Sequence, residues 1–575
     1  MGMARTVADL LIDTLAEAGV ERIYGLSGDS LNGITDSIRR QERIRWIHVR
    51  HEETAAFAAG AEAHLTGRLS VCAGSCGPGN LHLINGLYDC HRSRVPVLAI
   101  AAQIPSQEIG SGYFQETHPE HLFAQCSHYC ELVSHPEQMP RVLEIAIQTA
   151  LSRRGVSVVT IPGDIALKAA VAEARLRFPP PRSTVCPADD ELESLARVLN
   201  GSKKVTILGG AGCAGAHAEL IALASKLNAP IVHAMRGKEF IEYDNPFDVG
   251  MTGLLGFSSG YHAMMDCDLL LMIGTDFPYQ QFFPRDATVV QIDLRGEQLG
   301  KRSKVDYGYV GDARATLQAL LPKLTQNDHR KHLQNSLDHY KRTRMGLDAS
   351  ATQGPHNRPV HPQYAAKVLD ELASEDAIFS CDVGTPTIWA ARYLTMNGKR
   401  RLLGSFNHGS MANALPQAIG AQASHPGRQV VALSGDGGLG MLMGELLSLR
   451  QLKTPVKIVL FRNDSLAFVE LEMKAAGVIE FGTDLENPNF AKMAEALGLL
   501  GLTANTPDQV RPMLAQALEH DGPALVEIPV SRQELSMPPT ITLEQMKGFS
   551  LFALKAVLSG HGDEILDLAK INLFH

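Results

Sequence analysis

The chain is built from short, uninterrupted apolar runs that alternate with longer stretches of helical character. In its first third the runs cover residues 22–26, 69–73, 95–101 and 156–161, and residues 53–63 form one of the helical stretches between them. Continuous apolar runs of this length are typical of strands that are buried on both faces of a parallel sheet. Alternation with helices therefore predicts an α/β fold in which helices cover the sheets.

The same alternation recurs in two later segments. The second segment has apolar runs at 204–208, 230–234, 269–273 and 288–292, and the third has them at 377–380, 430–433, 456–461 and 524–528. A proline-rich stretch at 179–187 and a polar stretch at 348–362 separate the segments and are interpreted as linkers. Because 575 residues are too many for one core, the sequence predicts three doubly wound parallel-sheet domains, at 1–184, 185–335 and 336–533, followed by a C-terminal segment at 534–575.

Composition excludes several classes of protein. A net charge of -9 argues against a nucleic-acid binder. No run of 18 apolar residues is present, and the N-terminus lacks a signal-peptide pattern, so we expect a cytoplasmic protein. The cysteine pairs Cys72/Cys76 and Cys126/Cys130 have no second pair at zinc-site spacing, and we expect the nine cysteines to be reduced and buried.

Two polar residues follow neighbouring strands of the third segment. Asp436 lies in the sequence Ser-Gly-Asp-Gly-Gly directly after the run at 430–433, and Asn463 comes 27 residues later, after the run at 456–461. Ligands of parallel sheets bind at the carboxyl ends of the strands, and Mg²⁺ prefers carboxylate and carbonyl oxygens. Asp436, Asn463 and the backbone oxygen of Ser465 are therefore candidate ligands of a magnesium ion that neutralises a diphosphate. The alternative is an ordinary glycine-rich turn.

The motif Gly435-Asp436-Gly437 followed by Asn463 resembles the signature of thiamine diphosphate enzymes. Two residues depart from the usual pattern. Arg462 stands where the family usually has the first of two asparagines, and Leu439 stands where it favours an aromatic residue. The resemblance implies a pyrimidine-binding first domain and a diphosphate-binding third domain.

A helix start at Glu52-Glu53, after Arg50-His51, resembles the motif whose first glutamate activates the cofactor. The resemblance implies that Glu52 hydrogen-bonds the aminopyrimidine ring, whereas Glu53 has no assigned role. It also implies that Met411 bends the cofactor and that the Gly409 carbonyl accepts a hydrogen bond from its amine; ordinary core packing is the alternative for Met411. The implied thiamine diphosphate site comprises Glu52, Gly409, Ser410, Met411, Asp436, Gly437, Gly438, Asn463, Asp464, Ser465, Leu466, Ala467, Phe468 and Val469.

The middle segment carries a possible dinucleotide motif. Gly210-Ala211-Gly212-Cys213-Ala214-Gly215 follows the run at 204–208 and matches G-x-G-x-x-G, but no acid ends the next run. Asp293 ends a later run, and an acid there suits a ribose. Resemblance to flavin-contacting loops implies that FAD is bound by Thr252, Gly253, Leu254, Leu255, Gly274, Thr275, Asp276, Phe277, Pro278, Tyr279 and Asp293. A middle domain that has lost its cofactor is the alternative.

The chain most closely resembles bacterial pyruvate oxidases of the ubiquinone-dependent type, from end to end. The stretches 72–80, 110–116, 381–385 and 404–412 are the most distinctive. The resemblance implies oxidative decarboxylation of pyruvate to acetate and CO₂, with electrons passed through FAD to ubiquinone. It places Phe114, Gln115 and Phe468 around the active site, although core packing is the alternative for the two phenylalanines. Acetolactate synthase is the nearest rival function, and a catalytically inactive scaffold is a rival from another class.

The C-terminal tail has apolar residues at helical spacing, with Ile565, Leu568 and Ala569 on one stripe. Such a helix could lie in a membrane interface, or it could dock on the body of the protein. The resemblance implies that the tail binds phospholipid, which would place the enzyme peripherally on the inner membrane. It also implies a homo-oligomer of at least two copies, with a tetramer expected, in which Glu52 and Asp436 meet across an interface between subunits.

Overall fold

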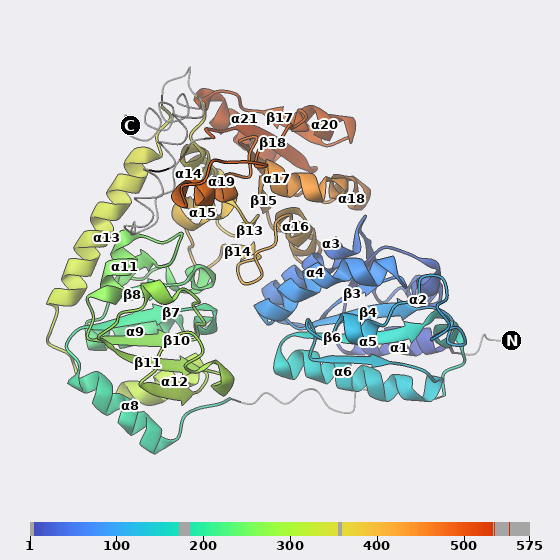
Figure 1. Ribbon diagram of the computed structural model, residues 1–575, viewed down its shortest axis with the longest axis horizontal. Coiled ribbons are helices and arrows are strands. Elements are labelled where there is room, and N and C mark those ends of the chain that lie inside the picture. The colour runs from blue at the N-terminus through green and yellow to red at the C-terminus, as the bar shows by residue number, and fades with distance from the viewer. Residues whose placement is uncertain (1–4, 172–183, 355–358, 533, 535–550, 552–575) are drawn as a thin grey trace.

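The computed structural model describes residues 5–171, 184–354, 359–532, 534 and 551, and these residues form three six-stranded parallel sheets (Figure 1). The expected three-domain α/β fold is confirmed. Each sheet lies within one of the three expected segments, and helices cover its faces. The expected proline-rich linker and the tail lie largely outside the described residues.

The first sheet has the strand order β2-β1-β3-β4-β6-β5. Its strands are β1 (Arg22–Gly25), β2 (Arg45–His48), β3 (Ser70–Gly74), β4 (Val97–Gln103), β5 (Tyr129–Leu132) and β6 (Val156–Pro162). Its helices are α1 (Val7–Glu17), α2 (Asn32–Gln41), α3 (Glu52–Thr66), α4 (Pro78–Ser93), α5 (Pro119–Leu122), α6 (Met139–Arg153) and α7 (Gly163–Leu167).

The second sheet has the order β12-β11-β10-β7-β8-β9, which is the order of dinucleotide-binding folds. Its strands are β7 (Val205–Gly209), β8 (Ile231–His233), β9 (Asp248–Met251), β10 (Leu269–Ile273), β11 (Thr288–Asp293) and β12 (Tyr307–Val310). Its helices are α8 (Asp189–Gly201), α9 (His217–Leu227), α10 (Lys238–Ile241), α11 (Ser258–Met265) and α12 (Ala313–Leu320). The long α13 (Lys331–Ser350) leads from this domain to the third.

The third sheet repeats the topology of the first, in the order β14-β13-β15-β16-β18-β17. Its strands are β13 (Ile378–Cys381), β14 (Arg401–Gly404), β15 (Val430–Gly435), β16 (Lys457–Arg462), β17 (Leu500–Thr503) and β18 (Ala524–Pro529). Its helices are α14 (Pro362–Leu372), α15 (Thr385–Tyr393), α16 (Ala414–Ser424), α17 (Asp436–Met441), α18 (Leu446–Leu452), α19 (Ala467–Ala475), α20 (Phe490–Ala496) and α21 (Pro507–Glu519).

The first and third domains share one hydrophobic core, because the alanine-rich helices α3 and α16 pack directly against each other. At this crossing Gly420 lies so close to the backbone of Ala58 that a Cβ atom would clash with its carbonyl oxygen. The shared core fixes the start of α3, which carries Glu52, relative to the third domain.

Among the described residues, no helix has both the length and the apolar character needed to cross a membrane.

Candidate active site

The ends of β15 and β16 bring the candidate magnesium ligands together. These strands pair in parallel, with Gly435 opposite Phe461, so Asp436 and Asn463 both emerge at the same edge of the sheet. The backbone N–H of Asp464 donates a 2.7 Å hydrogen bond to Oδ2 of Asp436, and the N–H of Ser465 donates to Oδ1 of Asn463 at 3.2 Å. Asp464 has a left-handed backbone, with φ of 54°, which turns the chain sharply at this point.

The Asp436 carboxylate is buried and richly hydrogen-bonded. Its residue is 2% exposed, and burial raises the pKa of Asp436 to about 6. Asn487, from the loop before α20, also donates to Oδ2 of Asp436 at 2.7 Å and to Oδ1 of Asp464 at 2.9 Å. Asn487 was not among the predicted site residues, because it lies in a loop with no motif of its own.

The two glycines after Asp436 let neighbouring side chains pack closely against the backbone of this loop. A Cβ on Gly437 would lie 2.9 Å from Leu466 and 3.2 Å from the terminal methyl group of Met411, so Met411 reaches this loop. A Cβ on Gly438 would clash with Oδ2 of Asp382, the residue that follows β13. This oxygen is buried and has no hydrogen-bond partner in the described protein, and burial raises the pKa of Asp382 to about 7.

The two residues that depart from the thiamine diphosphate pattern are accommodated without disturbing Asp436. Arg462 donates to Glu527, on β18, at 2.7 Å and lies 3.1 Å from the Asp464 carboxylate. The guanidinium group is therefore held by two acids beside the site. Leu439 is 2% exposed and belongs to the core shared by the first and third domains.

The segment after Asn463 connects the metal site to the end of the described chain. Ser465 and Glu470 are both buried, and the Ser465 hydroxyl donates to Glu470 at 2.5 Å. Arg532 donates to the same carboxylate at 3.2 Å and lies 2.6 Å from Asp484. Ion pairs thus connect the chain just before the C-terminal segment to α19, which carries Ala467, Phe468 and Val469.

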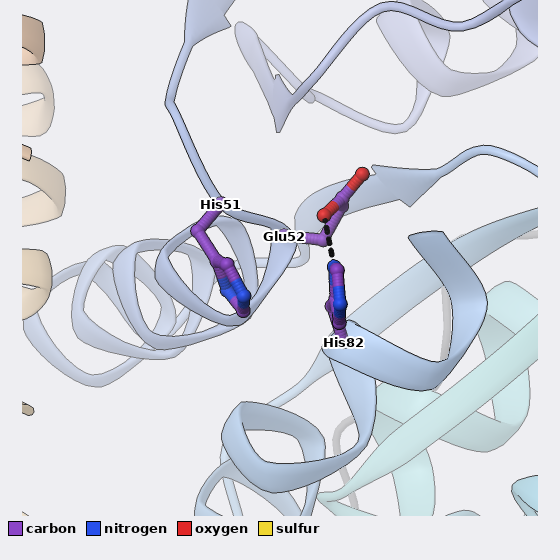
Figure 2. A group of neighbouring side chains, drawn as sticks. All are labelled: His51, Glu52 and His82. Atoms are coloured by element: carbon purple, nitrogen blue, oxygen red, sulfur yellow. Dashed lines mark hydrogen bonds and ion pairs between the residues drawn. The ribbon is translucent and has the colours of Figure 1, made fainter. Parts of the chain in front are cut away.

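Glu52 is the first residue of α3, and its residue is 5% exposed. His82, on α4, donates from Nδ1 to Oε2 of Glu52 at 3.0 Å (Figure 2). The two helices cross closely because Gly86, on α4, faces α3; a Cβ on Gly86 would lie 2.6 Å from the Cβ of Ala56. His82 was not among the predicted site residues; its position one turn after Gly-Pro-Gly was the available signal.

The segment that precedes α16 crosses to the first domain. Asn85, on α4, donates to Oε1 of Glu53 at 2.7 Å and to the Ser410 hydroxyl at 2.8 Å, and its own oxygen bonds His408 at 2.8 Å. Ser410 therefore lies beside α4, the helix that also carries His82, the hydrogen-bond partner of Glu52. No hydrogen bond or ion pair among the described residues joins Glu52 to Asp436 itself.

Gln115, in the loop between β4 and α5, has a strained backbone. Its φ is 62°, and Gly77 packs against it so tightly that a Cβ on Gly77 would lie 2.8 Å from its side chain. The buried Cys76 thiol donates to the Gln115 side-chain oxygen at 3.3 Å. The neighbouring Phe114 is 78% exposed, so core packing does not explain this residue.

A cavity of about 1440 Å³ lies where the three domains meet. All eleven residues expected to contact a flavin line this cavity, together with Gly210 and Gly212. At the switch point of the second sheet, Gly212 follows β7 and packs on Gly274, which follows β10, and its N–H donates to the Gly274 carbonyl at 2.9 Å. The third domain contributes residues 405–409 and Phe468 to the same walls.

The walls of the cavity are cationic and incompletely hydrogen-bonded. Arg94 pairs with Asp276 at 2.9 Å, whereas burial lowers the pKa of Arg154, Arg236 and Arg295. Buried polar atoms with no partner in the described protein include Nδ1 of His91, Oγ1 of Thr252 and Nε of Arg302. Buried polar groups in proteins are nearly always paired, so these walls suit a large anionic, polar ligand.

Family models match all three domains. The N-terminal thiamine pyrophosphate binding domain matches residues 5–122, the central domain of thiamine pyrophosphate enzymes matches 192–320, and the C-terminal binding domain matches 382–528. A pyruvate oxidase from Lactiplantibacillus plantarum is 30% identical over 90% of this chain and 87% of its own length. The chain belongs to the thiamine pyrophosphate enzyme family.

A second relative of this thiamine pyrophosphate enzyme is named for a different activity, and a third is named for none. An acetolactate synthase from Arthrospira platensis is 31% identical over 93% of the chain and 95% of its own length. An uncharacterized 42.6 kDa protein from Pseudomonas amyloderamosa is 63% identical over 64% of the chain and 94% of its own length. Family membership supports binding of thiamine diphosphate, the same compound as thiamine pyrophosphate, and decarboxylation of a 2-oxo acid.

Proposed function

We propose that this enzyme oxidises pyruvate to acetate and CO₂ with thiamine diphosphate and Mg²⁺, and that its electrons pass through FAD to ubiquinone. The observation that carries the proposal is the cavity between the domains. The loops expected to contact FAD line it, and so do Phe468 and residues 405–409, which belong to the expected thiamine diphosphate site. A flavin there would lie within reach of the decarboxylation site.

The residues at the ends of β15 and β16 fit a metal-bound diphosphate. Asp436 and Asn463 offer one carboxylate and one amide oxygen, the ligand types that Mg²⁺ prefers, and Ser465 would add a backbone oxygen. Gly437 and Gly438 let this loop pack closely against Met411 and Asp382, because neither carries a Cβ. When bound, thiamine diphosphate supplies the electron sink for the loss of CO₂. Glu52 would hold a proton at the aminopyrimidine ring, and Met411 would support the bent form of the cofactor.

The walls of the large cavity fit FAD. Gly212 and Gly274 bring backbone close to backbone at the switch point, where dinucleotide diphosphates bind. Asp293 ends β11, is 5% exposed, and could accept hydrogen bonds from a ribose. The unpaired Thr252 hydroxyl and the buried arginines would bind oxygens of the ligand. The pyruvate oxidase relative supports pyruvate as the substrate.

The remaining parts of the proposal concern the assembly and the membrane. A homodimer or tetramer would let Glu52 of one copy act with Asp436 of another. The C-terminal residues 534–575, outside the described chain apart from 534 and 551, would bind phospholipid and hold an otherwise cytoplasmic enzyme on the inner membrane, where ubiquinone is found. Removal of the residues after Gly560 should leave pyruvate decarboxylation intact and abolish stimulation by lipid; liposome binding by the truncated protein equal to that of the full chain would contradict this.

The experiment that tests the proposed function is a visible spectrum of the purified protein before and after addition of pyruvate. We expect a flavin band that pyruvate bleaches only when thiamine diphosphate and Mg²⁺ are present, with acetate as the product. Acetolactate without flavin reduction would overturn the proposal in favour of the activity named for the acetolactate synthase relative. Absence of both products would favour an inactive scaffold.

A further inference from the structure

Three titratable side chains gather at the start of α3, and their nearest ligand atoms all lie within 4.8 Å of one another (Figure 2). Glu52 and His51 come from the start of α3, and His82 comes from α4. The Glu52 side chain is 7% exposed, whereas the His82 side chain is 45% exposed. In the single chain, a buried carboxyl group is thus hydrogen-bonded to a ring that is partly exposed at the surface.

The stacking of the two rings argues against a metal site. The His51 and His82 rings have their centroids 4.3 Å apart and their planes only 24° from parallel. A metal ion lies about 2 Å from an imidazole nitrogen and close to the plane of the ring, so two nearly parallel stacked rings cannot both point at one ion. His51 is also committed elsewhere, because its Nδ1 accepts the backbone N–H of Glu53 at 3.2 Å and caps α3.

The same cap assigns the proton of the His51 ring. Because Nδ1 of His51 accepts a hydrogen bond, its proton is on Nε2 and the ring is neutral. Burial and the neighbouring His82 also lower the pKa of His51, which favours the same neutral ring. In the stack, the ring that points its Nδ1 at the Glu52 carboxylate is therefore His82.

We propose that His82 relays protons between solvent and Glu52, which makes His82 a positioning residue that acts through Glu52 on the cofactor. This inference rests on the proposed role of Glu52. In one direction, charged His82 loses its Nδ1 proton, an O–H bond forms on Oε2 of Glu52, and the ring is left neutral with its proton on Nε2. In the other direction, Glu52 returns the proton to Nδ1, and water removes the proton from Nε2.

The burial of Glu52 is the reason that a proton relay is needed. A carboxyl group that shares a proton with a bound ring must regain and lose protons in each cycle, yet this one has almost no contact with water. The titratable groups that face the His82 ring are Glu52 and His51, with Glu53 behind them, and Glu53 is engaged by Asn85 at 2.7 Å. The bond to Oε2 is the direct path from Glu52 to the exposed ring.

The first test records the ring-nitrogen signals of the histidines by NMR in the cofactor-free protein, with the His82→Gln variant to assign the His82 signals. We expect Glu52→Gln to shift the Nδ1 signal of His82, because the hydrogen bond from Nδ1 to the carboxylate is weakened. An unchanged Nδ1 signal of His82 would overturn the proposal. This measurement does not depend on the proposed function.

The second test measures exchange of the C2 proton of bound thiamine diphosphate at increasing imidazole concentration, without pyruvate. We expect a wild-type rate that imidazole does not change, and a His82→Ala rate that is about 10²-fold lower in dilute buffer and is restored by imidazole. His51→Asn, which keeps a capping side chain, should behave like the wild type, and His329→Gln is a surface control. A His82→Ala rate that equals the wild type, or that is slow and unresponsive to imidazole, would overturn the relay. Failure of pyruvate oxidation would not affect this result.

Discussion

The side-chain amide of Asn487 donates a 2.7 Å hydrogen bond to Oδ2 of Asp436, across 51 residues of sequence. The same amide donates to the Asp464 carboxylate at 2.9 Å. Asn487 therefore holds together the segments that follow two neighbouring strands. The other oxygen of Asp436, Oδ1, accepts the N–H of Gly437 and faces the glycine loop. Partners of this kind orient metal ligands and determine much of the affinity for the ion.

Replacement of Asn487 by alanine should weaken Mg²⁺ binding in the presence of thiamine diphosphate by about 10–100-fold, because the Asp436 carboxylate loses its orientation. Titration calorimetry with Mg²⁺ measures the change. The matched control is Asn489→Ala. Asn489 caps α20 through the N–H of Lys492, so its loss should cost about 1 kcal/mol of stability and leave the affinity for Mg²⁺ unchanged. Equal Mg²⁺ affinities in both variants would show that Asn487 does not support the site.

Replacement of Gly212 by alanine should abolish flavin binding. A Cβ at this position would lie 2.5 Å from the Cα of Gly274, so the two loops at the switch point must move apart. Flavin content of the purified variant, measured from its absorption spectrum, checks this expectation. Gly346→Ala is the control, because Gly346 lies within α13 with open space around its Cα, and alanine favours a helix by up to about 1 kcal/mol. Normal flavin content in Gly212→Ala would contradict the assignment of the cavity.

The strands that could be predicted from the sequence are the central ones. Twelve apolar runs were expected to be strands, and all twelve are found, four in the middle of each sheet. The six strands that were missed, β2, β5, β9, β12, β14 and β17, are the edges of the three sheets. An edge strand is covered on fewer sides, and Tyr307–Val310, for example, buries only one of its four residues. Asp248–Met251 is buried, but an acid and a glycine interrupt its apolar pattern.

The candidate site could be predicted where chain order alone determines position. Asp436 and Asn463 follow adjacent parallel strands, so their proximity needed only the strand assignments. The partners of these residues could not be predicted in the same way. Asn487 reaches Asp436 from a loop, and His82 meets Glu52 because two helices cross at a particular angle. Contacts of this kind depend on tertiary packing, which no local pattern records.

Conversion of Arg462 to asparagine, the residue usual in the family, should destabilise the protein. Glu527 is fully buried and would lose its charged partner, which we expect to cost about 1–3 kcal/mol, since Arg462 is itself partly exposed. Denaturant unfolding measures the loss. The double variant Arg462→Asn/Glu527→Gln should recover much of it, because glutamine can still accept the N–H of Ala491. A double variant as unstable as the sum of the single variants would show that the two residues are not coupled.

Stability should depend on pH through Asp89, which accepts a 2.8 Å hydrogen bond from Ser405 and joins α4 to the segment at the large cavity. Burial raises the pKa of Asp89 from 3.8 to about 6. Between these values the folded protein binds a proton that the unfolded chain has released, so the stabilising effect is complete below about pH 4 and is lost as the pH rises through 6.

The variant Asp89→Asn retains an acceptor for Ser405 and cannot ionise. Its unfolding free energy, relative to that of the wild type, should therefore increase by roughly 1–2 kcal/mol between pH 5 and pH 8. Denaturant unfolding of both proteins across this range measures the difference, and a difference that stays constant with pH would mean that Asp89 ionises as easily in the folded protein as in the unfolded chain.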